Sequence, residues 1–227
     1  MDVIRVLVAD DEPLVRFGLR ALLNAAEDIE VVGEACDGAE ALARTHDLAP
    51  DVVVTDLRMP GMDGITLTRQ LAALPNPPKV LVLTTFDTSE GVREAMQAGA
   101  GGYLLKDAPP EQVLGAVRLV TEGGVVLAPA SAARLIAAPK SPGAVARLSI
   151  EQRRRLEGLS KQQEEVLVHL AQGYSNAQIA QRMYLTEGTV RAYVSRLLAA
   201  LKLENRTQAA ILAYQAGLVG GTTGEER

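Results

Sequence analysis

The chain has 227 residues, 48% of them hydrophobic and 22% charged, which is the composition of a soluble protein with one large or two ordinary domains. Its single cysteine, Cys36, excludes an internal disulfide. The sequence has no apolar run of roughly 18 residues and no basic leader, so we expect a cytoplasmic protein that does not enter a membrane. The net charge of −5 hides an uneven distribution. Residues 1–122 contain 20 acidic and 10 basic residues, whereas the part from residue 151 onward is mildly basic. This difference indicates two domains with different partners.

Residues 1–122 alternate short apolar runs with helical patterns. This alternation is typical of βαβ units, and five repeats predict a doubly wound α/β domain with a five-stranded parallel sheet. Sites in such sheets form at the carboxyl ends of the strands. The expected strands are residues 4–9, 30–35, 52–56, 79–84 and 102–105, and the expected helices are residues 13–26, 38–46, 64–74, 89–98 and 110–122.

Residues 123–158 are expected to form a linker. Gly123 and Gly124 end the last helix of the first domain, and the stretch that follows is rich in Ala, Pro, Ser and Gly, with room for one short helix over residues 130–137. The three arginines at 153–155 are more typical of a solvated face than of a binding patch.

From residue 159 the pattern is helical only, which predicts a small all-α domain over residues 159–218 and a tail over 219–227. Ser160 and Ser175 each stand three residues before a glutamine, an arrangement typical of a capping box that opens a helix. The expected helices are residues 161–172, 176–183, 187–201 and 207–216.

Three acidic residues are expected to meet at one edge of the sheet. Asp10 and Asp11 end the first expected strand, and Asp56 ends the third. If these strands are neighbours, the three carboxylates converge, and like charges at close range repel unless a hard cation shares them. Carboxylate oxygens suit Mg²⁺, so the cluster predicts a metal-assisted phosphoryl site with Asp56 as the acceptor and Asp10, Asp11 and Asp56 as metal ligands.

Two further strand ends carry groups that handle phosphate. The fourth expected strand leads to Thr84, whose hydroxyl can donate a hydrogen bond to a phosphoryl oxygen, and the fifth leads to Lys106, whose ammonium can neutralise another. Each of these residues alone could be an ordinary solvated strand end. Five of them in register indicate a site.

Residues 3–122 resemble a response-regulator receiver domain, which has a flavodoxin-like fold. The resemblance implies a two-component system in which a sensor histidine kinase transfers a phosphoryl group to Asp56. It implies that the protein has no enzyme activity other than Mg²⁺-dependent self-phosphorylation and autodephosphorylation at Asp56. It also implies a switch, in which Thr84 moves toward the phosphate and Tyr103 turns inward; the alternative for Tyr103 is an ordinary, partly buried tyrosine. The motifs that carry the resemblance are Ala9-Asp10-Asp11-Glu12, residues 55–64, residues 83–87 and residues 102–107.

Residues 159–218 resemble the LuxR-type helix-turn-helix domain of NarL/FixJ response regulators, which implies a regulator of transcription that binds double-stranded DNA. The resemblance rests on Gly173-Tyr174-Ser175-Asn176, Thr189-Val190-Arg191 and residues 205–209, among others. Tyr193 stands where histidine is frequent, Ala200 where lysine is frequent, and Gln162-Gln163 where Arg-Glu is usual. With fewer basic residues we expect weak binding by monomers and reliance on a homodimer.

Helical geometry supports this interpretation. At 100° per residue, residues 187–201 form one apolar stripe and an opposite face of small residues that can approach the major groove closely. Arg191 could read guanine or hold a phosphate, and Ala192 could meet a thymine methyl group. Asn176, Thr189 and Arg206 suit phosphate contacts. The candidate DNA contacts are Asn176, Thr189, Arg191, Ala192, Ser195, Arg196 and Arg206.

The leading hypothesis is a transcription regulator in which phosphorylation of Asp56 promotes dimer formation or frees the helical domain. The last helix is either a dimer face or packs within its own domain. The alternatives are a constitutive regulator whose receiver only dimerises, a phosphatase that forms an aspartyl-phosphate, and a helical bundle that binds protein.

Overall fold

The computed structural model describes residues 3–85, 88–127, 148–203 and 205–218. The chain divides into two compact units, Met1–Ser131 and Ala132–Arg227, and each has its own hydrophobic core. Within the described ranges, no helix combines the length and the apolar character that crossing a membrane requires.

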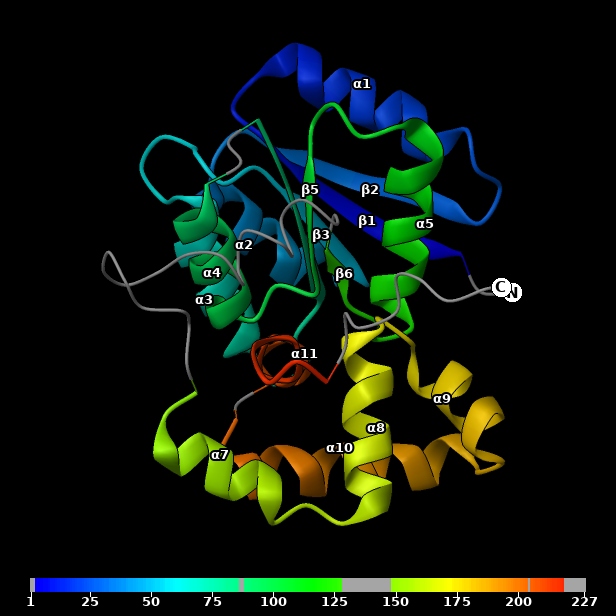
Figure 1. The fold of residues 1–227 in the computed structure, drawn as a ribbon. Coiled ribbons are helices and arrows are strands. Elements are labelled where there is room, and N and C mark those ends of the chain that lie inside the picture. The colour runs from blue at the N-terminus through cyan, green and yellow to red at the C-terminus, as the bar shows by residue number, and fades with distance from the viewer. Residues whose placement is uncertain (1–2, 86–87, 128–147, 204, 219–227) are drawn as a thin grey trace, which may run out of the picture. The chain divides into compact units, whose positions relative to one another are not determined.

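The first unit is a parallel sheet with helices on both faces (Figure 1), which confirms the predicted fold class. Its strand order is β2-β1-β3-β4-β5-β6, and every pair of neighbours is parallel. The strands are β1 (Ile4–Ala9), β2 (Ile29–Ala35), β3 (Val52–Thr55), β4 (Lys79–Thr84), β5 (Gly102–Leu105) and β6 (Val126–Leu127).

The sheet has six strands where five were expected. Strand β6 pairs Val126 with Gly102 and Leu127 with Tyr103, so these residues extend the sheet although the sequence suggested a linker. A two-residue strand is too short to produce a recognisable alternation of apolar and polar residues.

Helices α1 and α5 cover one face of the sheet, and α2, α3 and α4 cover the other (Figure 1). In the core of the first face, Leu19 and Leu23 of α1 pack with Val113 and Val117 of α5 against the strands. The helices are α1 (Pro13–Asn24), α2 (Gly38–Leu48), α3 (Gly64–Ala72), α4 (Ser89–Ala98) and α5 (Pro110–Thr121), close to the expected ranges.

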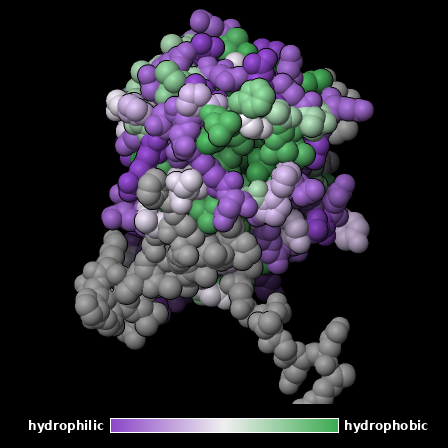
Figure 2. Space-filling model, turned by 90° about the horizontal axis from the view of Figure 1, so that it is seen from above, coloured by the Kyte–Doolittle hydropathy of each residue, from purple (hydrophilic) through white to green (hydrophobic). Residues whose placement is uncertain are grey.

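Two large apolar side chains of α1 lie on the outer surface. Leu14 is 81% exposed and Phe17 is 70% exposed. Residues three apart lie side by side on a helix, so they form one surface rather than two isolated residues. Figure 2, seen from the side on which α1 lies in Figure 1, shows hydrophobic residues grouped among hydrophilic ones.

The second unit contains only helices in its described residues. Its core is built from apolar residues of α8, α9, α10 and α11, including Leu167, Ile179, Leu197 and Leu212. The helices are α7 (Ile150–Glu157), α8 (Lys161–Ala171), α9 (Asn176–Met183), α10 (Glu187–Leu201) and α11 (Arg206–Gln215).

Helix α7 lies in the stretch that the sequence suggested was linker, so that expectation does not hold for residues 150–157. A capping box between Ser149 and Gln152 opens the helix. Its Arg155 donates a hydrogen bond of 3.2 Å to the carbonyl oxygen of Leu201 at the end of α10, and Leu156 packs against the core of the helical unit. The short helix considered over residues 130–137 lies outside the described residues.

Candidate functional site

The register of the two central strands brings three carboxylates together. Ala9 of β1 pairs with Thr55 of β3, so Asp10 and Asp56 leave the same sheet edge as neighbours. One oxygen from each of Asp10, Asp11 and Asp56 lies within 4.8 Å of the other two. Asp10 and Asp56 are buried, whereas Asp11 is exposed, so the cluster opens to solvent on one side.

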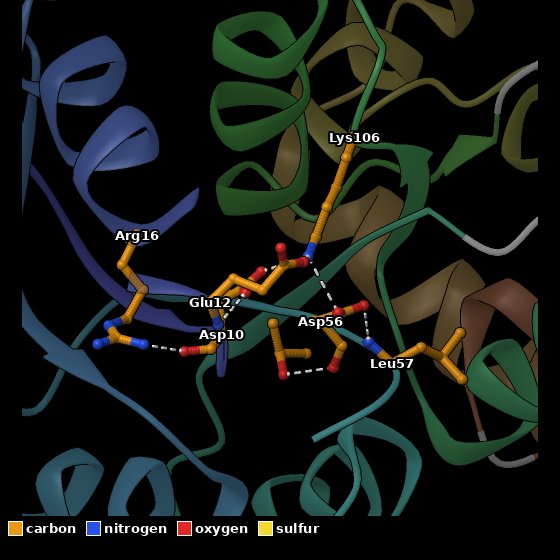
Figure 3. Close-up of polar contacts among 7 residues, drawn as sticks. Asp10, Glu12, Arg16, Asp56, Leu57 and Lys106 are labelled. Atoms are coloured by element: carbon orange, nitrogen blue, oxygen red, sulfur yellow. Dashed lines mark hydrogen bonds and ion pairs between the residues drawn. The ribbon is translucent and has the colours of Figure 1, made fainter. Parts of the chain in front are cut away.

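Lys106 reaches this cluster from the end of β5 (Figure 3). Its Nζ lies 2.8 Å from Oδ2 of Asp10, 3.0 Å from Oδ2 of Asp56 and 3.3 Å from Oε1 of Glu12. Burial of the ammonium opposes its charge, but its interactions with the carboxylates of Asp10 and Asp56 outweigh burial and raise the pKa of Lys106 above its ordinary value. Lys106 is therefore a fixed cation beside Asp56, and its contact with Glu12 was not expected from the sequence.

Asp10 has capacity for a further ligand. Its Oδ1 accepts a hydrogen bond of 3.0 Å from the backbone N–H of Glu12. Its buried Oδ2 accepts no hydrogen bond of good geometry, although the ammonium of Lys106 is 2.8 Å away. Burial raises the pKa of Asp10, against the opposing effects of Lys106 and the Glu12 N–H. A hard cation would stabilise the charged form of a buried carboxylate that lacks a well-placed donor. The three carboxylates of Asp10, Asp11 and Asp56 therefore fit Mg²⁺.

Backbone contacts hold Asp56 in place. The N–H of Leu57 donates to Oδ1 of Asp56 at 2.5 Å, and the N–H of Asp56 donates to the carbonyl oxygen of Ala9 at 2.9 Å. Helix α3 begins close to this turn, because a Cβ added at Gly64 would overlap the backbone oxygen of Asp56. The position therefore requires glycine, and the backbone of Asp56 is held between β1 and α3.

Thr84 and Tyr103 lie inside the first unit. Thr84 ends β4, and both side chains are fully buried. A Cβ built on Gly91 of α4 would lie 3.7 Å from the Tyr103 hydroxyl, so this ring points toward α4. Tyr103 is thus more deeply buried than an ordinary, partly buried tyrosine, and its role in a switch remains a prediction.

The outer face of α10 carries most of the expected DNA contacts. Val190, Leu197 and Leu201 are buried on the inner side of the helix, and Ala192 and Ser195 are exposed on the other. Thr186 caps the helix by accepting a hydrogen bond from the N–H of Thr189, and the two threonine hydroxyls are 2.8 Å apart. The helix therefore presents the small outer face that its periodicity predicted.

Arg191 and Arg196 also lie on the exposed side of α10. Nη2 of Arg191 is 3.1 Å from Oε1 of Glu187, one helical turn earlier. The guanidinium of Arg196 lies over the ring of Tyr193, 4.8 Å from the ring centroid. The ring belongs to one of the positions at which the chain departs from the usual pattern of the resembled domain.

Arg206 and Asn176 contact each other instead of extending into solvent. Arg206 donates to the carbonyl oxygen of Tyr174 at 2.6 Å and to Oδ1 of Asn176 at 3.3 Å, which joins the start of α11 to the start of α9. Burial lowers the pKa of Arg206 to about 10, so it stays charged at neutral pH. Its phosphate contact remains a prediction, and its internal role had no signal in the sequence because it depends on two helices meeting.

Comparison with known proteins places both units in described families. Residues 6–118 match the family described as "Response regulator receiver domain", and residues 157–213 match "Bacterial regulatory proteins, luxR family". The chain is 42% identical to the DNA-binding transcriptional activator DevR/DosR of Mycobacterium tuberculosis over 212 residues, 93% of this chain and 94% of that protein.

Solved structures of other response regulators resemble this chain over nearly its whole length. The response regulator ChrA of a heme-sensing two-component system is 42% identical, with a TM-score of 0.54 over 96% of this chain and all of that one. The response regulator RcsB, solved in complex with DNA, is 25% identical, with a TM-score of 0.55 and the same coverage of both chains.

Proposed function

Since this chain belongs to the response regulators that join a receiver domain to a LuxR-type DNA-binding domain, we propose that phosphorylation of Asp56 by a sensor histidine kinase controls its action on transcription. The observation that carries this proposal is Lys106 Nζ at 3.0 Å from Oδ2 of Asp56, inside a cluster of three carboxylates. A carboxylate beside a fixed ammonium and a cation site has what an acceptor of phosphoryl groups needs.

Mg²⁺ is the proposed cofactor, held by Asp10, Asp11 and Asp56, and when bound it neutralises charge on the transferring group. The chain's own residues provide the rest. Leu57 N–H orients Asp56, and Lys106 neutralises a phosphoryl oxygen once the group is attached. The proposed chemistry is confined to Asp56: its carboxylate takes the phosphoryl group from the phosphohistidine of the kinase, which is released as free histidine, and water later hydrolyses the acyl phosphate to inorganic phosphate.

The proposed switch acts through buried residues of neighbouring strands. A phosphoryl group on Asp56 competes with Asp10 and Glu12 for the Lys106 ammonium and offers Thr84 an acceptor. Thr84 and Tyr103 lie on adjacent strands, β4 and β5, and both are fully buried, so a shift of one requires repacking around the other. Phosphate thereby biases the receiver between two packings.

The proposed output is a homodimer that binds two DNA half-sites through the outer faces of two α10 helices. The RcsB–DNA complex supports DNA binding by a protein of this architecture. The exposed Leu14 and Phe17 of α1 supply apolar area for self-association of the receiver.

Labelling with a small phosphodonor tests the acceptor. The wild-type protein is incubated with acetyl phosphate, with and without Mg²⁺, and the phosphoryl group is located by mass spectrometry of peptides. We expect Mg²⁺-dependent labelling of Asp56 in the wild type and none in Asp56→Asn. Asp47→Asn, at an exposed position of α2, serves as the matched control and should be labelled normally. Labelling of Asp56→Asn at the wild-type level would refute the assignment.

A further inference from the structure

The two outward arginines of α10 differ in what surrounds them. Arg191 is paired with the carboxylate of Glu187 at 3.1 Å, which offsets its charge. Among the residues that the structure describes, no carboxylate pairs with Arg196. Its contacts are the ring of Tyr193, 4.8 Å away, and the carbonyl oxygen of Ala192, which accepts from Nε at 3.3 Å. Arg196 is therefore the outward guanidinium of α10 whose charge is not already offset by an acid.

The ring beneath Arg196 is itself held from a second helix. The Tyr193 hydroxyl donates a hydrogen bond of 3.3 Å to Oε1 of Gln162 in the first turn of α8, and the tyrosine is half-buried. Tyr193 and Arg196 are three residues apart, so they are neighbours on the helix surface. The tyrosine thus contacts α8 through its hydroxyl and the guanidinium through the face of its ring.

The contact between Gln162 and Tyr193 is matched in hydrogen-bond chemistry. The phenol O–H is a donor, and the side-chain oxygen of glutamine is an acceptor. Gln162 of α8 and Tyr193 of α10 therefore give each other a partner.

We propose that Tyr193 is a positioning residue, which with Gln162 holds the guanidinium of Arg196 ready for contact with a DNA phosphate. The proposal rests on the DNA binding proposed above and adds a residue that raises the affinity for DNA. A free arginine side chain loses rotamer freedom when it binds, whereas one already stacked on a fixed ring loses less. Because α10 carries few cations, holding the Arg196 guanidinium in place accounts for a large share of the affinity for DNA.

A double-mutant cycle in the full-length protein separates positioning from direct contact. The probe is a fluorescent duplex of about three helical turns with randomised sequence, titrated by anisotropy at several salt concentrations. We expect Arg196→Ala to weaken binding most and to reduce the salt slope by about one. Tyr193→Leu should weaken it about two- to fivefold, and in the Arg196→Ala background it should have no further effect.

Tyr193→Phe is the matched control, because it keeps the ring under Arg196 and loses only the bond to Gln162. We expect a smaller loss than for Tyr193→Leu, and Gln162→Leu should match Tyr193→Phe without adding to it. Thermal unfolding of each variant identifies any loss that comes from stability alone.

The outcomes distinguish this inference from the proposed function. If the wild type binds duplex DNA but Tyr193→Leu costs the same factor with and without Arg196, Tyr193 does not act through Arg196 and the inference is wrong. No effect of Tyr193→Leu at all overturns it equally. If the wild type binds no duplex under any condition, the DNA-binding proposal fails and takes this inference with it.

Discussion

Asp10 shows how a buried carboxylate lowers the stability of the fold around it. Burial is the largest influence on its pKa and raises it, although Lys106 and the Glu12 N–H act in the opposite direction. The folded state therefore holds the Asp10 proton more tightly than the unfolded chain does. This part of the stability is fully present below the unfolded pKa of Asp10, and it is lost as the pH rises through its folded pKa.

Asp10→Asn should therefore stabilise the metal-free protein at neutral pH, by an amount that shrinks as the pH falls toward the ordinary range of aspartate. Urea unfolding in EDTA at neutral and mildly acidic pH measures this difference. The same variant should lose most of the stabilisation by Mg²⁺ that we expect for the wild type, because a neutral amide replaces an anionic ligand. A variant that is less stable than the wild type in EDTA at neutral pH would contradict this account of Asp10.

Gly64 shows a second constraint at the scale of single residues. A Cβ at this position would overlap the carbonyl oxygen of Asp56, and neither backbone can yield without moving Asp56. Gly64→Ala should destabilise the receiver by about 1–3 kcal/mol and slow phosphorylation of Asp56. Gly115→Ala is the control, because a Cβ there meets nothing within 4 Å inside α5. That change should stabilise by about 0.5–1 kcal/mol in the same urea titration. Equal effects of the two changes would argue against a tight approach at Gly64.

Element boundaries followed from the sequence where the apolar period was strong and were missed where it was weak. All five expected strands of the sheet and the five expected helices of the receiver are present. Strand β6 is too short to show a period, and α7 has only Ile150 and Leu156 as apolar residues among charged ones. Its capping box, Ser149 with Gln152, was the local signal that could have revealed it.

One apolar residue of α7 is packed against a core and the other is exposed, so the docking of this helix can be tested. Leu156 packs against the core of the helical unit, whereas Ile150 is 87% exposed. We expect Leu156→Ala to destabilise that unit by about 1–2 kcal/mol, less than for a fully buried leucine, and Ile150→Ala to stay within about 0.5 kcal/mol of the wild type. Chemical unfolding followed by circular dichroism compares them, and similar losses in both would mean that α7 does not dock as described.

At the scale of the whole molecule, two units with separate cores carry two separate sites. The receiver core lies between the sheet and its helices, and the helical unit has its own core around Leu167 and Leu197. Under the proposed function, a phosphoryl group on Asp56 therefore acts on DNA binding through a change in assembly or in the relation between the units.

Phosphorylation should raise the dimer fraction, DNA affinity, or both. A dimer neutralises twice as many DNA phosphates as a monomer, so the slope of log affinity against log salt should steepen by about 0.9 for each additional phosphate neutralised. Sedimentation and duplex titration with and without acetyl phosphate measure these two quantities, with Asp56→Asn as the variant that should not respond. If neither quantity changes in the phosphorylated wild type, the gating proposal is wrong.

The sequence by itself determined the order of strands and helices, the three carboxylates and the lysine at the strand ends, and the apolar stripe of α10. These features depend on local periodicity and on the rule that parallel strands end at one edge. Only the tertiary structure decided that Lys106 also contacts Glu12, that Arg206 joins α9 to α11, and that Tyr193 bridges Gln162 and Arg196. Each of these contacts joins residues whose distance depends on how whole elements pack, and no local pattern encodes that distance.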